Sequence, residues 1–250
     1  MTIVAVDHNN IESVIQAFLE GADIKPNLDR LREYLSPKAD ILIAGGAIRN
    51  IIINIIHGNA PLTRDIDLFI GGVEKDYPLG KNLAGENIQK TDLGGLRWYP
   101  STSDYVYDIS LLPNFIIIDK YKLAPTINNL LTSIDFTVNA VIYDVVYKKF
   151  YEQGCISSIK KRIIKFNTQR IASKLILAYR ILLIRHKTGF FLSQRVFTYV
   201  KSQIDLDLLI DLKTLFIAKQ GKKKAEALMN DYDYICRFRK YSDYIRGKRS

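Results

Sequence analysis

Two aspartates, Asp65 and Asp67, stand one residue apart in an apolar run that has the length of a strand. Because side chains alternate across a strand, both carboxylates face one side of it, and Ile66 and Leu68 face the other. Carboxylates about 7 Å apart along a strand repel each other unless a cation lies between them. Mg²⁺ is typically held by one or two carboxylates together with substrate phosphates. These residues are therefore candidate Mg²⁺ ligands.

A glycine pair precedes these acids. The apolar run 41–44 reads as a strand, Gly45 and Gly46 follow it, and a helix-length apolar segment then carries Arg49 in its first turn. The free N–H groups at a helix N-terminus favour an anion. Either motif alone is common by chance, but the order strand, glycine pair, helix, loop, strand favours phosphoryl or nucleotidyl transfer.

Three blocks of sequence together resemble a known family. Residues 45–50 (GGAIRN), 64–68 (RDIDL) and 135–143 (DFTVNAVIY) resemble motifs of class II tRNA nucleotidyltransferases and bacterial poly(A) polymerases, within the polymerase-β nucleotidyltransferase superfamily. The resemblance covers residues 40–190 in scattered blocks. It implies an α+β fold, in which a polymerase-β-type head of mixed sheet and helices is followed by an all-helical basic neck and body.

The resemblance also implies a third carboxylate on an adjacent strand. Asp108, embedded in the apolar run 105–111, is the favoured candidate, and Asp104 at the start of that run reads more simply as a turn residue. Asp65, Asp67 and Asp108 would then be the catalytic residues and the ligands of a two-metal Mg²⁺ site.

Nucleotide binding is expected to involve residues from several segments. Gly45, Gly46 and Arg49 would hold the triphosphate, and Arg64 would either reach a phosphate or pair with a neighbouring acid. By resemblance, Asp135 and Asn139 would bind nucleotide and ribose. Arg180 matches one of the neck arginines that precede a Gly-Phe pair in the family. The expected nucleotide ligands are Gly45, Gly46, Arg49, Arg64, Asp135, Asn139 and Arg180.

The chain also departs from the family pattern. Ser133 and Ile134 stand where the family has one or two arginines, and Leu177 and Leu183 occupy two positions of the neck arginine series. The family's Glu-Asp-x-x-Arg motif, which reads the incoming base, has no clear counterpart. These departures weaken the expectation of CTP and ATP selection and of true CCA addition.

Charge is divided unevenly along the chain, whose net charge is +10. Residues 1–159 hold 14 basic and 19 acidic residues, whereas residues 160–250 hold 22 and 7. This division favours metal chemistry in the first part and a polyanion, RNA, at the second, over the alternative of a generally basic protein with well-solvated helix faces. The candidate RNA ligands are Lys174, Arg185, Lys222, Lys223, Lys224, Arg237 and Arg239.

The C-terminal stretch 231–250 interleaves aromatic and basic residues. Aromatic rings stack on bases while cations contact phosphates, so one interpretation is an RNA-binding tail. An amphipathic terminal helix with a few solvated charges explains the pattern equally well. Both alternatives stay open at this point.

Composition sets further limits. The chain is 48% hydrophobic and 25% charged, which is typical of a soluble globular protein, and it has no apolar run long enough to span a membrane. The start lacks a secretory signal, and Cys155 and Cys236 lack metal-ligand spacing, which together favour a cytoplasmic protein. We expect packing helices in residues 1–38, the head in 39–155, and an RNA-binding neck and tail in 156–250.

Periodicity and turn residues predict the following elements. Helices are expected at 9–20, 28–35, 168–187, 193–200, 206–218 and 222–229; strands at 41–44, 94–99, 105–111, 140–146 and 149–151; a loop or short irregular helix at 73–95; and a helix or irregular segment at 120–132.

The expected function is a metal-dependent nucleotidyltransferase that moves NMP from ATP, CTP or both to an RNA 3′ end. The favoured acceptor is tRNA, as in CCA-adding enzymes and poly(A) polymerases. An alternative is a toxin- or defence-type nucleotidyltransferase that modifies tRNA or a protein. A third is a non-catalytic RNA-binding module, which would be expected to have lost the acids; all three are present.

Overall fold

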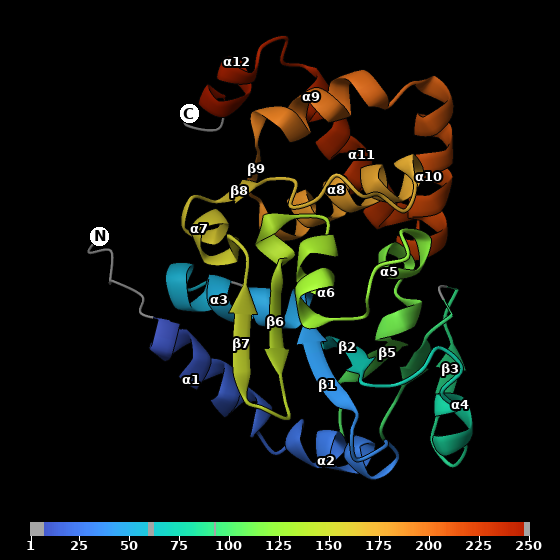
Figure 1. Ribbon diagram of the computed structural model, residues 1–250. Helices are drawn as coiled ribbons and strands as arrows, with labels where there is room; N and C mark the ends of the chain where they lie inside the picture. Colours follow the sequence, from blue (N-terminus) through green and yellow to red (C-terminus); the bar gives the residue numbers. More distant parts are fainter. Residues whose placement is uncertain (1–7, 60–62, 93, 248–250) are drawn as a thin grey trace.

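Seven strands form one mixed sheet in the computed structural model, which describes residues 8–59, 63–92 and 94–247. The strands are β1 (Asp40–Ala44), β2 (Asp65–Gly71), β3 (Ile88–Lys90), β4 (Leu96–Trp98), β5 (Val106–Leu111), β6 (Val141–Asp144) and β7 (Lys149–Glu152). Their order is β3-β4-β5-β2-β1-β6-β7, and β2 and β5 are parallel while the other neighbours are antiparallel. The sheet and its helices confirm the predicted α+β class (Figure 1).

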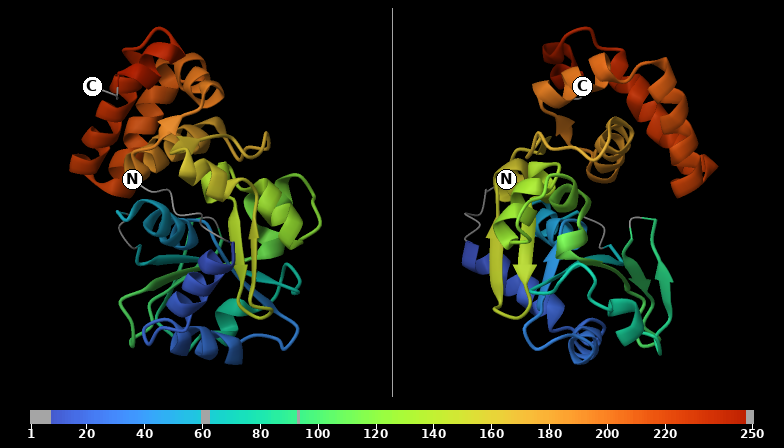
Figure 2. Two further views of the ribbon diagram at one scale, coloured as in Figure 1. Left: turned by 90° about the vertical axis from the view of Figure 1, so that its left-hand side faces the viewer. Right: turned by 45° about the vertical axis from the view of Figure 1, so that its right-hand side comes forward.

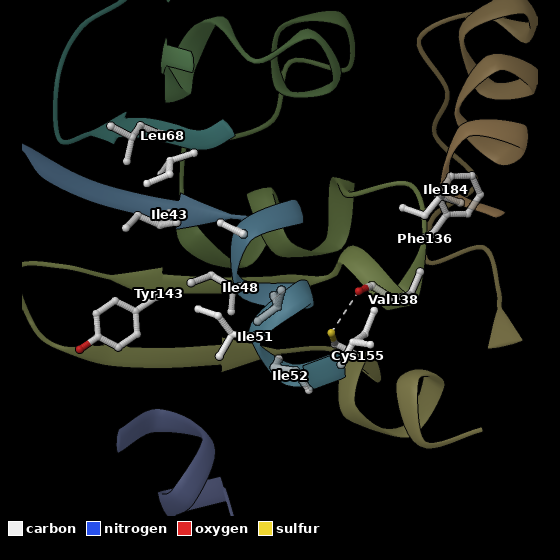
Figure 3. Close-up of a cluster of buried hydrophobic side chains, with 14 of the residues drawn as sticks. Ile43, Ile48, Ile51, Ile52, Leu68, Phe136, Val138, Tyr143, Cys155 and Ile184 are labelled. Atoms are coloured by element: carbon white, nitrogen blue, oxygen red, sulfur yellow. Dashed lines mark hydrogen bonds between the residues drawn. The ribbon is translucent and has the colours of Figure 1, made fainter. Parts of the chain in front are cut away.

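One face of the sheet packs against the glycine-initiated helix. This helix is α3 (Gly46–His57), and α1 (His8–Leu19) contacts it in turn. Figure 3 shows Ile43 and Leu68 of the sheet in the same cluster as Ile48, Ile51 and Ile52 of α3. The helix ends at Gly58, which has the left-handed conformation (φ 71°) that glycine adopts without strain.

The other face carries a second, smaller core. Leu42 and Ala44 of β1 pack there with Ile118 of α5 (Ile116–Lys120) and Leu130 of α6 (Ile127–Ser133). β1 alternates strictly between the two cores, because Ile41 and Ile43 belong to the first.

The remaining helices and turns lie around the sheet and after it. They are α2 (Lys25–Glu33), α4 (Leu79–Asn82), η1 (Leu112–Asn114), η2 (Thr137–Asn139), α7 (Cys155–Lys160), α8 (Lys174–Thr188), α9 (Gln194–Gln203), α10 (Leu206–Gln220), α11 (Lys222–Cys236) and α12 (Tyr241–Arg246). Two short parallel strands, β8 (Ile163–Ile164) and β9 (Phe191–Leu192), bracket α8. Figures 1 and 2 show α8 to α12 as a helical layer beyond one end of the sheet. None of the helices among the described residues is long and apolar enough to span a membrane.

Several predicted boundaries were wrong for local reasons. The segment 73–95, expected as a loop or short irregular helix, contains the short helix α4 as that expectation allows, but it also contains the strand β3, because β3 pairs with β4 across residues 91–95 despite its polar sequence. The helix expected at 168–187 begins at Lys174, where the Ser173 side chain accepts a hydrogen bond from Ile176 N–H and caps it. The helix expected at 222–229 continues to Cys236.

The aromatic residues of the C-terminal stretch point into the helical layer. Tyr244 is 1% exposed, and its ring contacts those of Phe197, Tyr234, Phe238 and Tyr241. Tyr232, Tyr234, Phe238 and Tyr241 are half-buried. Because these rings pack into the helical layer and against one another, the structure favours the amphipathic-helix alternative for this stretch.

Candidate active site

Three acids meet on one face of the sheet. In the strand register Asp67 of β2 lies beside Asp108 of β5, and Asp65 is two residues earlier on β2. Ile66 and Leu68 are fully buried on the opposite face. The predicted shared face of Asp65 and Asp67 is confirmed, and Asp108 adds a third carboxylate at the same level.

Of the three acids, Asp67 has the environment that least favours a negative charge. It is half-buried, and its pKa is raised to about 6 by burial first, then by Asp108 and Asp65, against the opposing effects of Arg180 and Arg49. The mutual repulsion of these carboxylates favours a positive charge near Asp67.

Asp67 sets an expected pH dependence of stability. Its pKa of about 6 lies above the ordinary 3.8, so between these values the folded protein holds a proton that the unfolded chain does not. The resulting stabilisation is fully present below pH 3.8 and is lost as the pH rises through about 6. Urea unfolding of the metal-free protein should show that the free energy of unfolding falls by on the order of 1–2 kcal/mol as the pH rises through this range. This figure is reduced to allow for the partial exposure of Asp67. Asp67→Asn should flatten this slope; an unchanged slope would contradict the assignment.

The glycine turn stands directly beside these acids. Ala44 pairs with Asp67, and a Cβ on Gly45 would lie 3.7 Å from Asp67 Oδ2. Gly45 has φ 69°, which favours glycine, and α3 begins at the next residue without a side-chain cap. Helices α6, α8 and α10 are instead capped by Thr126, Ser173 and Asp205. The N–H groups of the first turn of α3 are thus left to an external acceptor next to the acids.

Arg49 is held inside the protein by two asparagines. Its Nε and Nη2 donate to Asn50 Oδ1 at 3.0 and 2.8 Å, and its Nη1 donates to Asn139 Oδ1 at 2.7 Å. The residue is 5% exposed, and burial lowers its pKa to about 10. This network joins the first turn of α3 to the 135–139 motif and places a buried positive charge beside Gly46, at the start of α3.

Asp135 and Arg180 connect the sheet to the helical layer. Arg180 of α8 pairs through Nε with Asp135 Oδ2 and donates from Nη2 to Oδ1 at 3.2 Å. Asp135 also accepts the Phe136 N–H at 2.9 Å. The Asp135 carboxylate raises the pKa of Arg180. The only neck arginine that matched the family pattern therefore positions the motif aspartate.

Asp108 is not free to bind a cation, because an arginine holds both of its oxygens. Arg97 of β4 is its cross-strand partner and donates from Nε to Oδ1 at 2.7 Å and from Nη2 to Oδ2 at 2.6 Å. Across residues 8–59, 63–92 and 94–247, no three potential ligand side chains converge on one point. The donor set thus fits one Mg²⁺ on Asp65 and Asp67, which with substrate phosphates is a common coordination, whereas the expected third ligand is already paired.

Two basic residues near the acids were not among the predicted ligands. Arg97 could have been found by pairing runs 94–99 and 105–111 as a hairpin, which sets it opposite Asp108. Lys187, at the end of α8, lies close enough to Asp65 and Asp67 for their charges to raise its pKa, against larger lowering effects of lost hydration, Arg49 and Lys224. No local motif singles out Lys187, because tertiary packing alone brings it there.

The remaining residues that were expected to bind nucleotide or RNA lie outside this group of acids. Arg64 is exposed and pairs with Asp104 at 3.5 Å, which agrees with the ion-pair alternative. Lys174, Lys222, Lys223, Arg237 and Arg239 are exposed on the helical layer, and Lys224 is half-buried there. Arg185 differs from expectation: its side chain is 8% exposed, pairs with Asp231 and lies over the Tyr234 ring. It cannot contact an RNA backbone from that position.

The buried position of Arg185 leads to a stability prediction. Arg185→Ala should lower the free energy of unfolding by about 3 kcal/mol, because Asp231 would lose the cation that compensates it. The exposed Arg237→Ala should change it by less than about 0.5 kcal/mol. Urea denaturation of both variants checks this; equal, small effects would contradict a structural role for Arg185.

Comparison with known proteins gives matches in structure and none in sequence. No family model matches the sequence, and no curated protein does. The structure is similar to that of a CCA-adding enzyme in complex with ATP (TM-score 0.57, 14% identity, covering 88% of this chain and 54% of that one). The chain has the fold of the CCA-adding enzymes.

Two further structures agree with this fold. One is a tRNA-processing enzyme in an apo form (TM-score 0.54, 17% identity, covering 93% of this chain and 59% of that one). The other is the Thermotoga maritima CCA-adding enzyme complexed with tRNA (TM-score 0.55, 16% identity, covering 88% and 54%). This fold confirms the resemblance inferred from residues 45–50, 64–68 and 135–143. The chain spans little more than half the length of these enzymes.

Proposed function

We propose that the protein transfers NMP from a nucleoside triphosphate to the 3′-hydroxyl of an RNA. The observation that carries the proposal is the placement of Asp65 and Asp67 beside the uncapped N-terminus of α3. Acids that attract a cation next to N–H groups that favour an anion suit a metal-bound triphosphate. The shared fold of the CCA-adding enzymes supports the same reaction.

Each residue has a distinct role in this proposal. Asp65 and Asp67 hold Mg²⁺, which when bound neutralises phosphate charge during an in-line displacement. The first turn of α3 receives phosphate oxygens through its N–H groups, and Gly45 keeps the turn beside Asp67 free of a side chain. Arg49 adds positive charge at the start of α3 while it orients Asn139, and Asp135 and Asn139 face the nucleotide.

The acceptor is proposed to be RNA, and tRNA above all. In this proposal residues 39–155 supply the chemistry, residues 156–250, with 22 basic and 7 acidic residues in 160–250, bind RNA, and residues 1–38 pack on the former. ATP and CTP are the candidate donors, since CCA-adding enzymes of the same fold are known in complex with each. The changed neck positions affect base choice: Leu177 is buried where the family has a cation, so that position makes no polar contact with a base.

The experiment offers each of the four α-labelled NTPs with Mg²⁺, first with total RNA and then with protein acceptors. Label in RNA that is absent with the Asp65→Asn/Asp67→Asn variant supports the proposal. Label in protein alone would assign the chain to the toxin- or defence-type alternative. No label in either acceptor, with Mg²⁺ or Mn²⁺, would refute both enzymatic assignments and favour a non-catalytic RNA-binding module.

A further inference from the structure

A small polar pocket lies between α3 and the end of α8. Its volume is about 80 Å³, which is room for two or three water molecules or one phosphate group. The residues that give it chemistry are Asn50, His57, Asn59, Arg162, Lys187 and Thr188. It lines one side of α3, roughly 6 to 16 Å along the helix axis from Gly46, and is therefore separate from the phosphate cradle at the helix start.

The pocket has an excess of positive charge and no lining carboxylate. Among the described residues, neither the Arg162 guanidinium nor the Lys187 ammonium takes part in an ion pair. Arg180, Arg185 and Lys219 of the helical layer are paired with Asp135, Asp231 and Asp92. What distinguishes Arg162 and Lys187 from the many exposed cations of this layer is that both line one pocket with no carboxylate in it.

The backbone fixes Arg162 at this pocket at some conformational cost. Arg162 has φ 50°, in the left-handed region that residues other than glycine adopt only at a conformational cost. Its N–H donates to Ile159 O and its carbonyl accepts from Phe191 N–H, both at 2.9 Å. The Ile159 carbonyl also accepts from His57 Nε2 at 2.8 Å, which requires the ring proton on Nε2. The pocket wall is thus built by hydrogen bonds that join α3, α7 and β9.

Other charged residues surround the cations of this pocket. The charges of Asp65, Asp67 and Lys224 of α11 all act on the Lys187 ammonium. Lys222 and Lys223 are exposed at the start of α11, which packs against α8. Basic residues therefore stand both at the pocket and at the start of the neighbouring helix α11.

We propose that this pocket binds a backbone phosphate of the acceptor RNA, upstream of the reacting 3′ end. Guanidinium and ammonium groups at a site without carboxylates are suited to phosphate oxygens, and the Thr188 and Asn59 side chains are polar neighbours for them. The assignment to RNA rests on the proposed function. The NTP and pyrophosphate carry the same phosphate group and are the alternative ligands of this pocket.

The test compares two double variants of the full chain. Arg162→Asn/Lys187→Met removes both cations, and asparagine tolerates the left-handed backbone at position 162. The control is Lys122→Asn/Lys213→Met, which also removes two cations: Lys122, at another left-handed position (φ 51°), and Lys213, an exposed residue of α10. Thermal melts first establish that both variants fold.

Binding of a labelled single-stranded RNA is then measured by fluorescence anisotropy with EDTA and without NTP. The pocket variant should bind about tenfold more weakly than the control, and its slope of log K against log salt should fall by about 0.7 for the lost phosphate contact. ATP and pyrophosphate affinities, measured in parallel, should not change. Because no transfer is needed, a protein that binds RNA through the pocket but transfers nothing would refute the proposed function and not this site.

Two results would overturn the proposal. Reduced ATP or pyrophosphate affinity with unchanged RNA binding would assign the pocket to the nucleotide and refute the backbone site. RNA and nucleotide affinities that match those of the control variant would show that the pocket binds no phosphate.

Discussion

Replacing Asp65 and Asp67 together by asparagine is expected to lower nucleotidyl transfer by about 10³-fold or more, without loss of the fold. The amide is neutral and a poorer ligand for Mg²⁺, so the site loses the charge that attracts the cation and the metal loses its anchors. Loss of electrostatic stabilisation at one position already costs 10²- to 10³-fold in well-studied enzymes, by order of magnitude.

The same double variant is expected to melt at a higher temperature than the original protein in metal-free buffer. Asp67 is half-buried and repelled by Asp108 and Asp65, so neutral side chains remove a destabilising interaction. Asp104→Asn is the matched control, because Asp104 is an exposed acid that pairs with Arg64 away from this row. Transfer by the double variant at the rate of the Asp104→Asn protein would contradict the assignment of the acids.

Arg97→Met is expected to raise the affinity for Mn²⁺ by about tenfold or more. Arg97 holds both oxygens of Asp108, which is the neighbour of Asp67 in the strand register, and so adds a positive charge on the adjacent strand. Its removal frees the third carboxylate, which completes the set of three acids in the strand register. Calorimetric titration of Mn²⁺ into the nucleotide-free protein measures the effect independently of activity.

Arg64→Met is the control for Arg97. It removes the same charge from an arginine whose partner, Asp104, lies outside the row of acids. If the two variants bind Mn²⁺ equally well, Arg97 does not limit access to Asp108. Weaker binding by Arg97→Met would mean that the ion pair holds Asp108 in place for the metal, and it would contradict a competition between Arg97 and the cation.

Local patterns were sufficient to predict the elements that carry the acids. The alternation in residues 65–71 placed Asp65 and Asp67 on one face, and Gly45 marked the start of α3 because few other residues adopt its conformation. The partners of these residues could not be inferred in the same way. The Arg97–Asp108 pair depends on the register of a hairpin, and the pairing of Arg180 with Asp135 depends on how α8 packs against the sheet.

The basic half illustrates the limit of composition. Its charge predicted a polyanion partner, yet Arg185, one of the predicted ligands, is buried against Asp231, and Lys187, which was not predicted, lies near the acids. Both residues belong to the last turn of α8. The packing of α11 on α8 decides which of the two residues faces the acids, and the periodicity of the sequence does not predict it.

The chemical identity of the acceptor group tests the proposed transfer most directly. RNA with an intact 3′ end and the same RNA after periodate oxidation, which destroys the terminal diol, are each incubated with the protein, Mg²⁺ and the α-labelled NTP found to be active. We predict labelled, extended product from the intact RNA alone, and none with the Asp65→Asn/Asp67→Asn variant. Equal labelling of the oxidised RNA, or labelling of protein in place of RNA, would contradict transfer to a 3′-hydroxyl.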